Sequence, residues 1–157
     1  LGIAIAALPS AFSLVDAGDA RIVLTPASTD GEMAVAGTVT IEADPPAEGG
    51  VNLVTALEAH KADVEARTDG VYKGQRELIA PLGSAFYSRG QWTGADADAA
   101  TQEETIVLML HPNGDRILRA TYVYPAGEDA GARVESLLEL VGEIEAAAAV
   151  ASDEGST

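Results

Sequence analysis

Apolar residues alternate with small or polar ones in several short runs of the first half of the chain. Ile3 and Ile5 alternate with alanines up to a proline, which cannot donate a backbone hydrogen bond, so this run predicts a strand. Two similar runs, 12–15 and 21–26, flank a turn rich in Asp and Gly, which predicts a hairpin. A further run, 35–41, ends before two prolines and predicts another strand.

The second half contains an uninterrupted run of large apolar residues. Residues 105–110 (TIVLML) are almost uniformly apolar, which is typical of a central strand covered on both faces. An Asn-Gly pair at 113–114 separates this run from a second β-rich run, 117–124, and predicts a hairpin. Further strands are expected at 77–79 and at 85–93, where three aromatic residues lie.

Two segments show helical spacing of their apolar positions. The first stripe consists of Leu53, Leu57, His60 and Val64. The second stripe consists of Val134, Leu137, Leu138, Val141 and Ile144. Asn52 stands where a helix cap is expected, so the first helix should begin after it and run to about Arg67. We expect the second helix to pack Leu137 and Leu138 on a sheet that contains Val107, Leu108 and Met109.

The order of these elements is strands, helix, strands, helix. This order predicts an α+β fold, in which two main helices cover an antiparallel sheet. The length and the 47% apolar content suit one domain with a real core. We expect that domain to span 1–150, followed by a frayed C-terminal tail at 151–157.

The charge of the chain limits its partners. Nine basic against 25 acidic residues give a net charge of −16, which disfavours nucleic acid and anionic membrane surfaces and leaves basic partners open. The sequence has no Cys and no apolar stretch close to the roughly 18 residues of a membrane span. The absence of an initial Met leaves room for an upstream signal peptide, so the bacterial envelope and the cytoplasm both stay open as locations.

The sequence contains none of the common short catalytic or cofactor motifs. It has no phosphate-binding glycine loop, no dinucleotide fingerprint and no serine nucleophile elbow, so we expect no cofactor and no catalytic residue. The two histidines, His60 and His111, lack metal-site spacing, and we expect no metal site. His60 falls on the apolar stripe of the first helix and is interpreted as a residue at the boundary of the core.

An acidic segment at 96–104 supports an alternative. Asp96, Asp98, Glu103 and Glu104 supply hard oxygen ligands, although their spacing does not fit an EF-hand loop. The simpler interpretation is a solvated acidic loop. The alternative is a small enzyme, carboxylate-dependent or metal-assisted, with its site near this loop.

Two groups of residues are candidates for contact with a partner. The first group is aromatic: Trp92, Tyr87, Tyr122 and Tyr124. Since aromatic residues make up only 4% of the chain, most of them should be needed for the core. The second group is a row of like charges expected on the final helix at i, i+4 and i+8: Glu135, Glu139 and Glu143.

The order of elements resembles that of the PsbP and Mog-type superfamily. The residues that carry this resemblance are a strand ending in proline (GIAIAALP), a hairpin reaching RIVLTP, a middle helix, an aromatic strand ending in Trp92, a long hairpin and a final amphipathic helix. The resemblance covers about residues 2–146 and implies a PsbP-like α/β/α sandwich. Proteins of this superfamily bind partners without catalysis. The resemblance therefore implies a noncatalytic bacterial accessory or adaptor protein that binds a protein or peptide, and it assigns no catalytic residue.

Overall fold

The computed structural model describes residues 2–18, 20–26, 38–46, 48–93, 101–126 and 130–147. The strands are β1 (Ile3–Ile5), β2 (Phe12–Ala17), β3 (Arg21–Pro26), β4 (Thr38–Ala43), β5 (Val71–Ala80), β6 (Gly83–Thr93), β7 (Thr101–Leu110), β8 (Ile117–Pro125) and β9 (Ile144–Ala146). The helices are α1 (Leu53–Glu65) and α2 (Ala130–Val141). Each predicted strand and helix has a counterpart here, although 35–37 of the predicted strand 35–41 lie outside the described residues, and β5 is longer than the sequence suggests.

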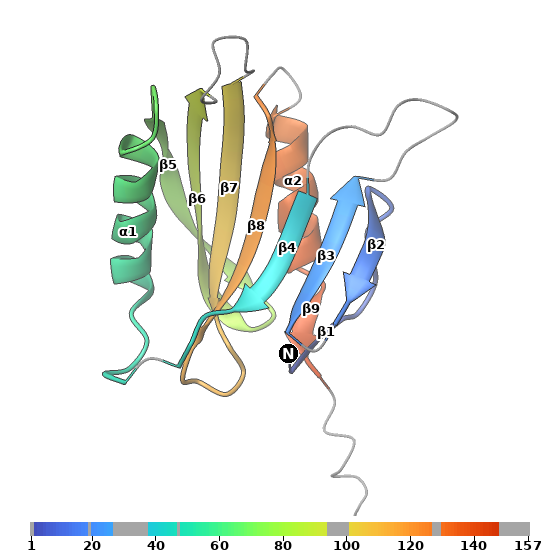
Figure 1. The fold of residues 1–157 in the computed structure, drawn as a ribbon. Helices are drawn as coiled ribbons and strands as arrows, with labels where there is room; N and C mark the ends of the chain where they lie inside the picture. The colour runs from blue at the N-terminus through green and yellow to red at the C-terminus, as the bar shows by residue number, and fades with distance from the viewer. Residues whose placement is uncertain are drawn as a thin grey trace, which may run out of the picture.

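Seven of the strands form one antiparallel sheet in the order β2-β3-β4-β8-β7-β6-β5. The remaining two, β1 and β9, form a separate antiparallel pair beside it (Figure 1). The hairpin predicted from the Asn-Gly pair is confirmed, since Leu110 of β7 pairs with Ile117 of β8 and Gly114 in the connection has a φ of 81°. The hairpin of β2 and β3 is also confirmed.

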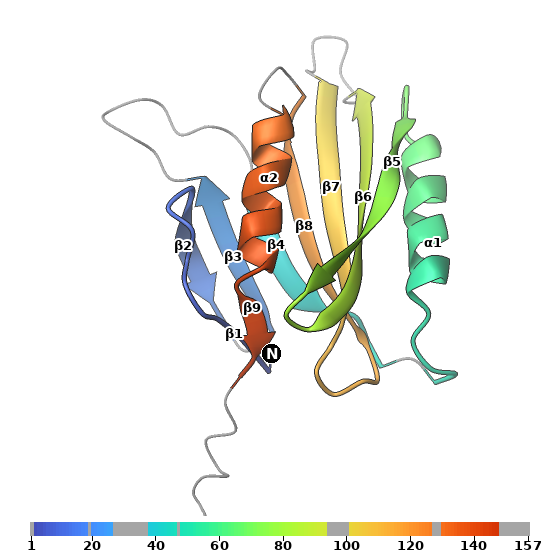
Figure 2. The same ribbon diagram turned by 180° about the vertical axis from the view of Figure 1, so that it is seen from behind.

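The two helices lie on opposite faces of the seven-stranded sheet (Figures 1 and 2). Alternate residues of β7 show how the sheet serves both helices: Ile106 and Leu108 pack in a small cluster with Leu57 of α1, whereas Val107 and Met109 belong to the larger cluster on the α2 side. The prediction of a central strand covered on both faces is therefore confirmed. The structure is an α+β sandwich with mostly antiparallel strands.

The second helix is shorter than its apolar stripe suggests. It ends at Val141, and Ile144 is instead a buried residue of strand β9. Glu143 also lies beyond the helix, so the expectation of three glutamates on one helical row is wrong; only Glu135 and Glu139 are on α2. The expected packing is wrong in one further detail, since Leu108 faces α1. Leu138 packs against the cluster of Val107 and Met109 as expected but is only half-buried, whereas Leu140 is fully buried.

The first helix is capped as expected and approaches the sheet closely. The side chain of Asn52 accepts a hydrogen bond from the amide of Thr55 at 3.0 Å. Near the other end of α1, buried Val64 lies over Gly90 of β6. A Cβ atom added to Gly90 would lie 2.5 and 2.6 Å from the methyl carbons of Val64. Glycine at this position therefore sets the distance between helix and sheet.

We expect Gly90→Ala to lower the free energy of unfolding by about 1–3 kcal/mol, because the new methyl group forces α1 away from the sheet. Adding Val64→Ala removes the atoms in conflict, so the double variant should lose less stability than the two single variants together. Urea unfolding of all four proteins measures this coupling as a double-mutant cycle. Additive losses would contradict the close approach of Val64 to Gly90.

Candidate functional site

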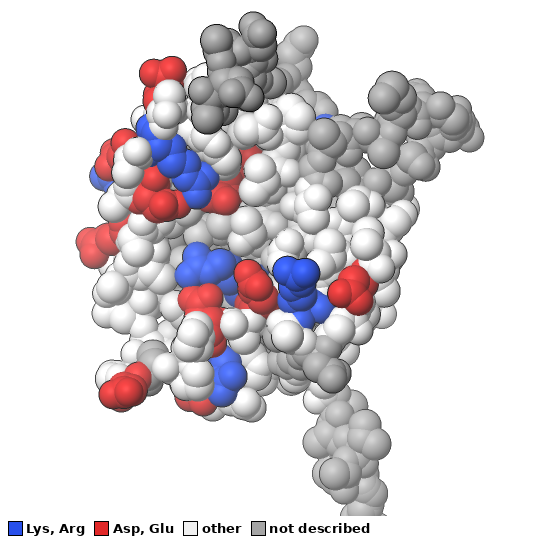
Figure 3. All heavy atoms as spheres, in the orientation of Figure 1, with Lys and Arg blue, Asp and Glu red and all other residues white. Residues whose placement is uncertain are grey.

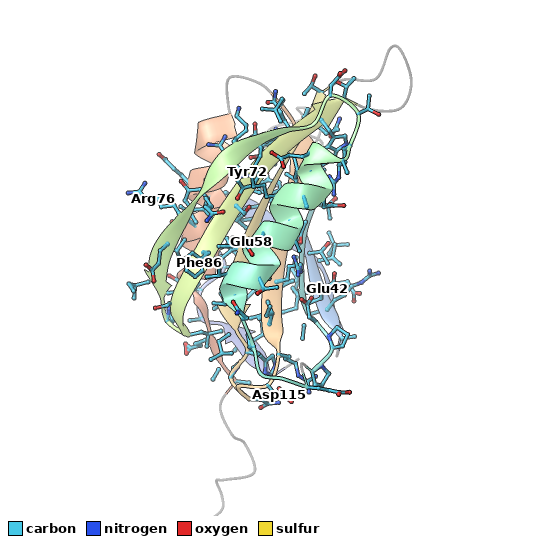
Figure 4. All side chains as sticks on the ribbon, turned by 90° about the vertical axis from the view of Figure 1, so that its left-hand side faces the viewer. Glu42, Glu58, Tyr72, Arg76, Phe86 and Asp115 are labelled. Atoms are coloured by element: carbon cyan, nitrogen blue, oxygen red, sulfur yellow. The ribbon has the colours of Figure 1, made fainter. Side chains whose placement is uncertain are left out.

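A cavity of about 290 Å³ opens between α1 and strands β7 and β8. Its lining combines small and apolar side chains with six polar or charged ones: Ala56, Ala59, His60, Asp63, Arg67, Glu104, Ile106, Arg119 and Thr121. The cavity lies on the α1 side of the sheet, which Figure 4 shows with α1 in front and Tyr72 beside it. Concave sites that join an apolar base with a few convergent polar groups are the usual form of a binding site.

His60 is the centre of the polar network at this cavity. It points from the buried side of α1 into the sheet, where Nδ1 lies 2.7 Å from the Ser88 hydroxyl and Nε2 lies 2.8 Å from Oε1 of Glu104. The Ser88 hydroxyl in turn lies 2.6 Å from the Tyr72 hydroxyl. Both ring nitrogens are therefore hydrogen-bonded, which is how a buried histidine avoids the cost of an unpaired polar group.

Two arginines stand at the cavity. Arg67 follows the end of α1, and its guanidinium stacks 4.1 Å from the centre of the Trp92 ring. The same guanidinium forms an ion pair with Asp63, one helical turn earlier, and lies 3.6 Å from the carboxylate of Glu104. Arg119 of β8 holds Asp44 in a two-bond contact of 2.9 and 3.3 Å. Both arginine side chains are partly exposed. Each cation therefore keeps its position through neighbours of its own and still reaches solvent.

Ser88, His60 and Glu104 are the three residue types of a hydrolytic triad, and their hydrogen bonds connect them in that order. Nucleophilic attack requires that the serine oxygen reach a substrate. Ser88 is 0% exposed, and Tyr72 occupies the other side of its hydroxyl. The arrangement therefore fixes α1 to the sheet and orients Glu104 in the cavity, and it offers no accessible nucleophile.

A second buried network lies on the opposite face of the sheet, around Glu103. Its carboxylate accepts hydrogen bonds from Arg89 at 2.6 Å and from Tyr124 at 2.7 Å, and Lys73 lies 3.6 Å away. Burial by itself disfavours the charged carboxylate, but the hydrogen bonds from Arg89 and Tyr124 and the charges of Arg89 and Lys73 outweigh it. The pKa of Glu103 is therefore held below its ordinary value. Burial also raises the pKa of Tyr124, which keeps its hydroxyl a donor.

The structure separates the residues that the sequence offers for contact with a partner. Trp92 lies beside the cavity, on the α1 face of β6. Tyr87 is half-buried on the other face of the same strand, and Tyr122 and Tyr124 are core residues there. On α2, Glu135 and Glu139 are exposed, and Glu143 follows the helix as described above.

The expected acidic loop is only partly described. Asp96 and Asp98 lie outside the described residues. Glu103 and Glu104 are not in a loop but are buried in β7, and their side chains point to opposite faces of the sheet, so this part of the prediction is wrong. The reason is that each glutamate finds cationic or histidine partners on neighbouring elements. In the part of the chain that the structure describes, no cluster of three or more His, Asp or Glu side chains could hold a metal ion.

One local pattern in the sequence indicates part of the cavity lining. His60, Asp63 and Arg67 recur at i, i+3 and i+7 and so share one side of a helix. Their partners come from other elements, with Ser88 28 positions and Glu104 44 positions away from His60. No local pattern connects residues that far apart. We also find that none of the described helices is long and apolar enough to cross a membrane.

Comparison with known proteins identifies the fold as that of Mog-type proteins. No protein-family profile matches the chain, and no curated protein matches it by sequence. Among solved structures, the Ran-binding protein Mog1p of Saccharomyces cerevisiae matches with a TM-score of 0.60 at 13% identity, over 88% of this chain and 87% of that chain. The fold-level resemblance to Mog-type proteins is therefore confirmed.

Two other solved structures show the same architecture. A point mutant of Mog1 matches with a TM-score of 0.62 at 12% identity, over 91% of this chain and 90% of that chain. LpqN of Mycobacterium tuberculosis, which is involved in cell envelope biogenesis, matches with a TM-score of 0.54 at 10% identity, over 91% of this chain and 82% of that chain. At identities this low, the three matches show a shared fold alone.

Proposed function

We propose that this protein is a noncatalytic accessory or adaptor protein that binds a protein or peptide partner in a groove beside α1. The observation that carries the proposal is the incomplete cover of the α1 face. Helix α1 packs on β5, β6 and β7, and no other described element lies over β8, β4 and β3 on that side (Figure 1). The cavity lies where the side of α1 meets β7 and the uncovered strand β8, and β4 and β3 continue the surface. We call this combined surface the α1 groove.

The α1 groove has two kinds of surface. Strand register places Val23, Thr40 and Thr121 in one row across β3, β4 and β8, all half-buried and uncharged. The neighbouring row across the same strands, Arg21, Glu42 and Arg119, is charged. Figure 3 shows this pale surface between two groups of charged side chains. An apolar or hydroxyl-lined strip with charges at its rim is suited to a peptide or a protein surface.

The fold neighbours support a binding role. Mog1p is described as a Ran-binding protein, and LpqN as involved in cell envelope biogenesis. The net charge of −16 supports a partner that carries basic residues and opposes nucleic acid. The buried hydroxyl of Ser88 and the ion-paired carboxylates of Glu103 and Glu104 support binding over carboxylate-dependent catalysis.

A photo-crosslinking amino acid in place of Thr121 tests the α1 groove. The matched control carries the same amino acid in place of Glu139, which is exposed on α2 at the opposite face. We expect irradiation in the source organism to give a discrete adduct with the partner from position 121 and none from position 139. The captured protein, once purified, should bind at least tenfold more weakly to the Thr121→Trp variant, in which the new side chain fills the groove. Its affinity for Glu139→Trp should equal that for the unsubstituted protein. Equal crosslinking at both positions, or equal affinities, would place the partner elsewhere.

A further inference from the structure

The hydrogen bonds around His60 form one continuous chain from the protein surface to the cavity. The chain joins the side-chain amide of Gln75 to Tyr72 at 2.9 Å, Tyr72 to Ser88 at 2.6 Å, Ser88 to His60 at 2.7 Å and His60 to Glu104 at 2.8 Å. Gln75 is exposed on the edge strand β5, whereas His60 and Ser88 are buried. A surface amide is therefore connected with a buried imidazole.

Each hydroxyl has one hydrogen to donate, and this fixes the direction of every bond in the chain. Tyr72 donates to Oε1 of Gln75, so its own oxygen must accept the hydrogen of Ser88. Ser88 then has no hydrogen for His60 and must accept one from Nδ1. The carboxylate of Glu104 accepts a second one from Nε2. With the Gln75 oxygen toward Tyr72, the His60 ring is a cation paired with Glu104.

Rotation of the Gln75 amide by half a turn reverses the donors and acceptors in the three hydrogen bonds between Gln75 and Nδ1 of His60. The NH₂ group of Gln75 then donates to Tyr72, Tyr72 donates to Ser88, and Ser88 donates to Nδ1 of His60. The ring keeps a hydrogen only on Nε2, toward Glu104, and is neutral. All four bonds are kept in both arrangements: the three between Gln75 and Nδ1 of His60 reverse, and Nε2 donates to Glu104 in each. The same arrangement of heavy atoms therefore accommodates two protonation states of His60.

We infer that this chain is a proton switch, in which the orientation of the Gln75 amide and the protonation of His60 change together and alter the charge of the cavity by one unit. The charged groups at the cavity are Asp63 and Arg67 on the α1 side, Glu104 from β7 and Arg119 from β8, which is paired with Asp44. On the β5 side His60 meets the Tyr72 ring at 6.3 Å, over which Lys61 lies at 5.8 Å.

The switch gives the cavity a pH-dependent preference. Two acidic and two basic side chains line it, and Asp44 is paired with Arg119, so these groups together carry one negative charge when His60 is neutral and none when His60 is a cation. At low pH the cavity should therefore attract a cationic group less strongly, a consequence that rests on the proposed binding role of the α1 groove. The hydrogen-bond chain itself belongs to the free protein, so its test does not require a partner.

Two substitutions at Gln75 fix opposite directions of the chain. Gln75→Glu supplies only acceptors and favours the cationic ring, whereas Gln75→Lys supplies only donors and favours the neutral ring. Long-range ¹H–¹⁵N spectra of the imidazole nitrogens, with His60→Gln to assign the signals, follow the loss of the Nδ1 hydrogen with pH. We expect the two variants to differ by about tenfold in proton affinity, which is about one pH unit.

The matched control repeats both substitutions in a Tyr72→Phe background, which keeps the charge at position 75 but interrupts the chain. In this background we expect the difference in His60 proton affinity between the two Gln75 variants to fall below about threefold, because only the through-space effect of the charge is left. Equal differences in the two backgrounds would overturn the switch. The unsubstituted protein gives an independent measurement: the side-chain amide signals of Gln75 should change with the same midpoint as the His60 ring, and an amide that ignores this midpoint would also overturn it.

Discussion

Leu137→Ala is expected to lower the free energy of unfolding by about 2–5 kcal/mol. Leu137 is fully buried in the larger core cluster, where α2 packs against the sheet side that carries Val107 and Met109. Truncation removes buried methyl groups and leaves a cavity that a close-packed core fills only in part. Urea unfolding followed by circular dichroism measures the loss, and an unchanged slope with denaturant shows that the two-state transition is kept.

The neighbouring residue provides the control for this experiment. Leu138 has the same side chain on the same helix but is half-buried at the margin of the cluster. Leu138→Ala should therefore lower the free energy of unfolding by less than half as much as Leu137→Ala, because folding removes less apolar surface from water at position 138. The reverse order of the two losses would show that α2 is rotated relative to the packing described above.

Glu103→Gln is expected to cost about 3 kcal/mol. The substitution leaves Arg89 beside a neutral amide in a network where Glu103 is 1% exposed, and an ion that loses its partner in such a place is strongly destabilising. Tyr124 can still donate to the amide oxygen, so the loss reflects mainly the charge. As a control, Asp115→Asn removes the exposed ion pair with Arg116 and should leave the urea midpoint unchanged.

The same pair of proteins has a predictable dependence on pH. Because the pKa of Glu103 is lower in the folded protein than its ordinary 4.5, its carboxylate contributes stability above that pH and loses the contribution as the pH falls through the folded value. Glutamine does not titrate. The stability difference between wild type and Glu103→Gln should therefore be constant above about pH 5 and should shrink at lower pH. A difference that grows on acidification would show that the folded protein holds this carboxyl in its neutral form.

Much of the fold follows from local patterns in the sequence. The apolar run of β7 indicates burial on both faces because a strand sends successive side chains to opposite sides. The Asn-Gly pair after it fixes a turn that few other residues adopt easily. The stripe on α1 with Asn52 before it defines both the buried side and the start of that helix. Each of these signals lies within a short stretch of chain, so it can be identified without knowledge of the fold.

Only the tertiary structure decides the polar positions. Glu103 and Glu104 precede an apolar run and look like loop residues, yet pairing with β6 and β8 extends the strand through them. Arg89, Tyr124 and His60 then supply the partners that make their burial possible.

The sequence by itself determined the order of strands and helices as far as α2, the central hairpin and the acidic character of the protein, because periodicity, turn chemistry and charge are local properties. The end of α2, the assignment of Tyr122 and Tyr124 to the core and the cavity beside α1 were decided by the folded chain. The physical reason is the distance along the chain. The burial and hydrogen bonds of these residues depend on partners from other strands and helices, and those contacts exist only once the sheet has assembled.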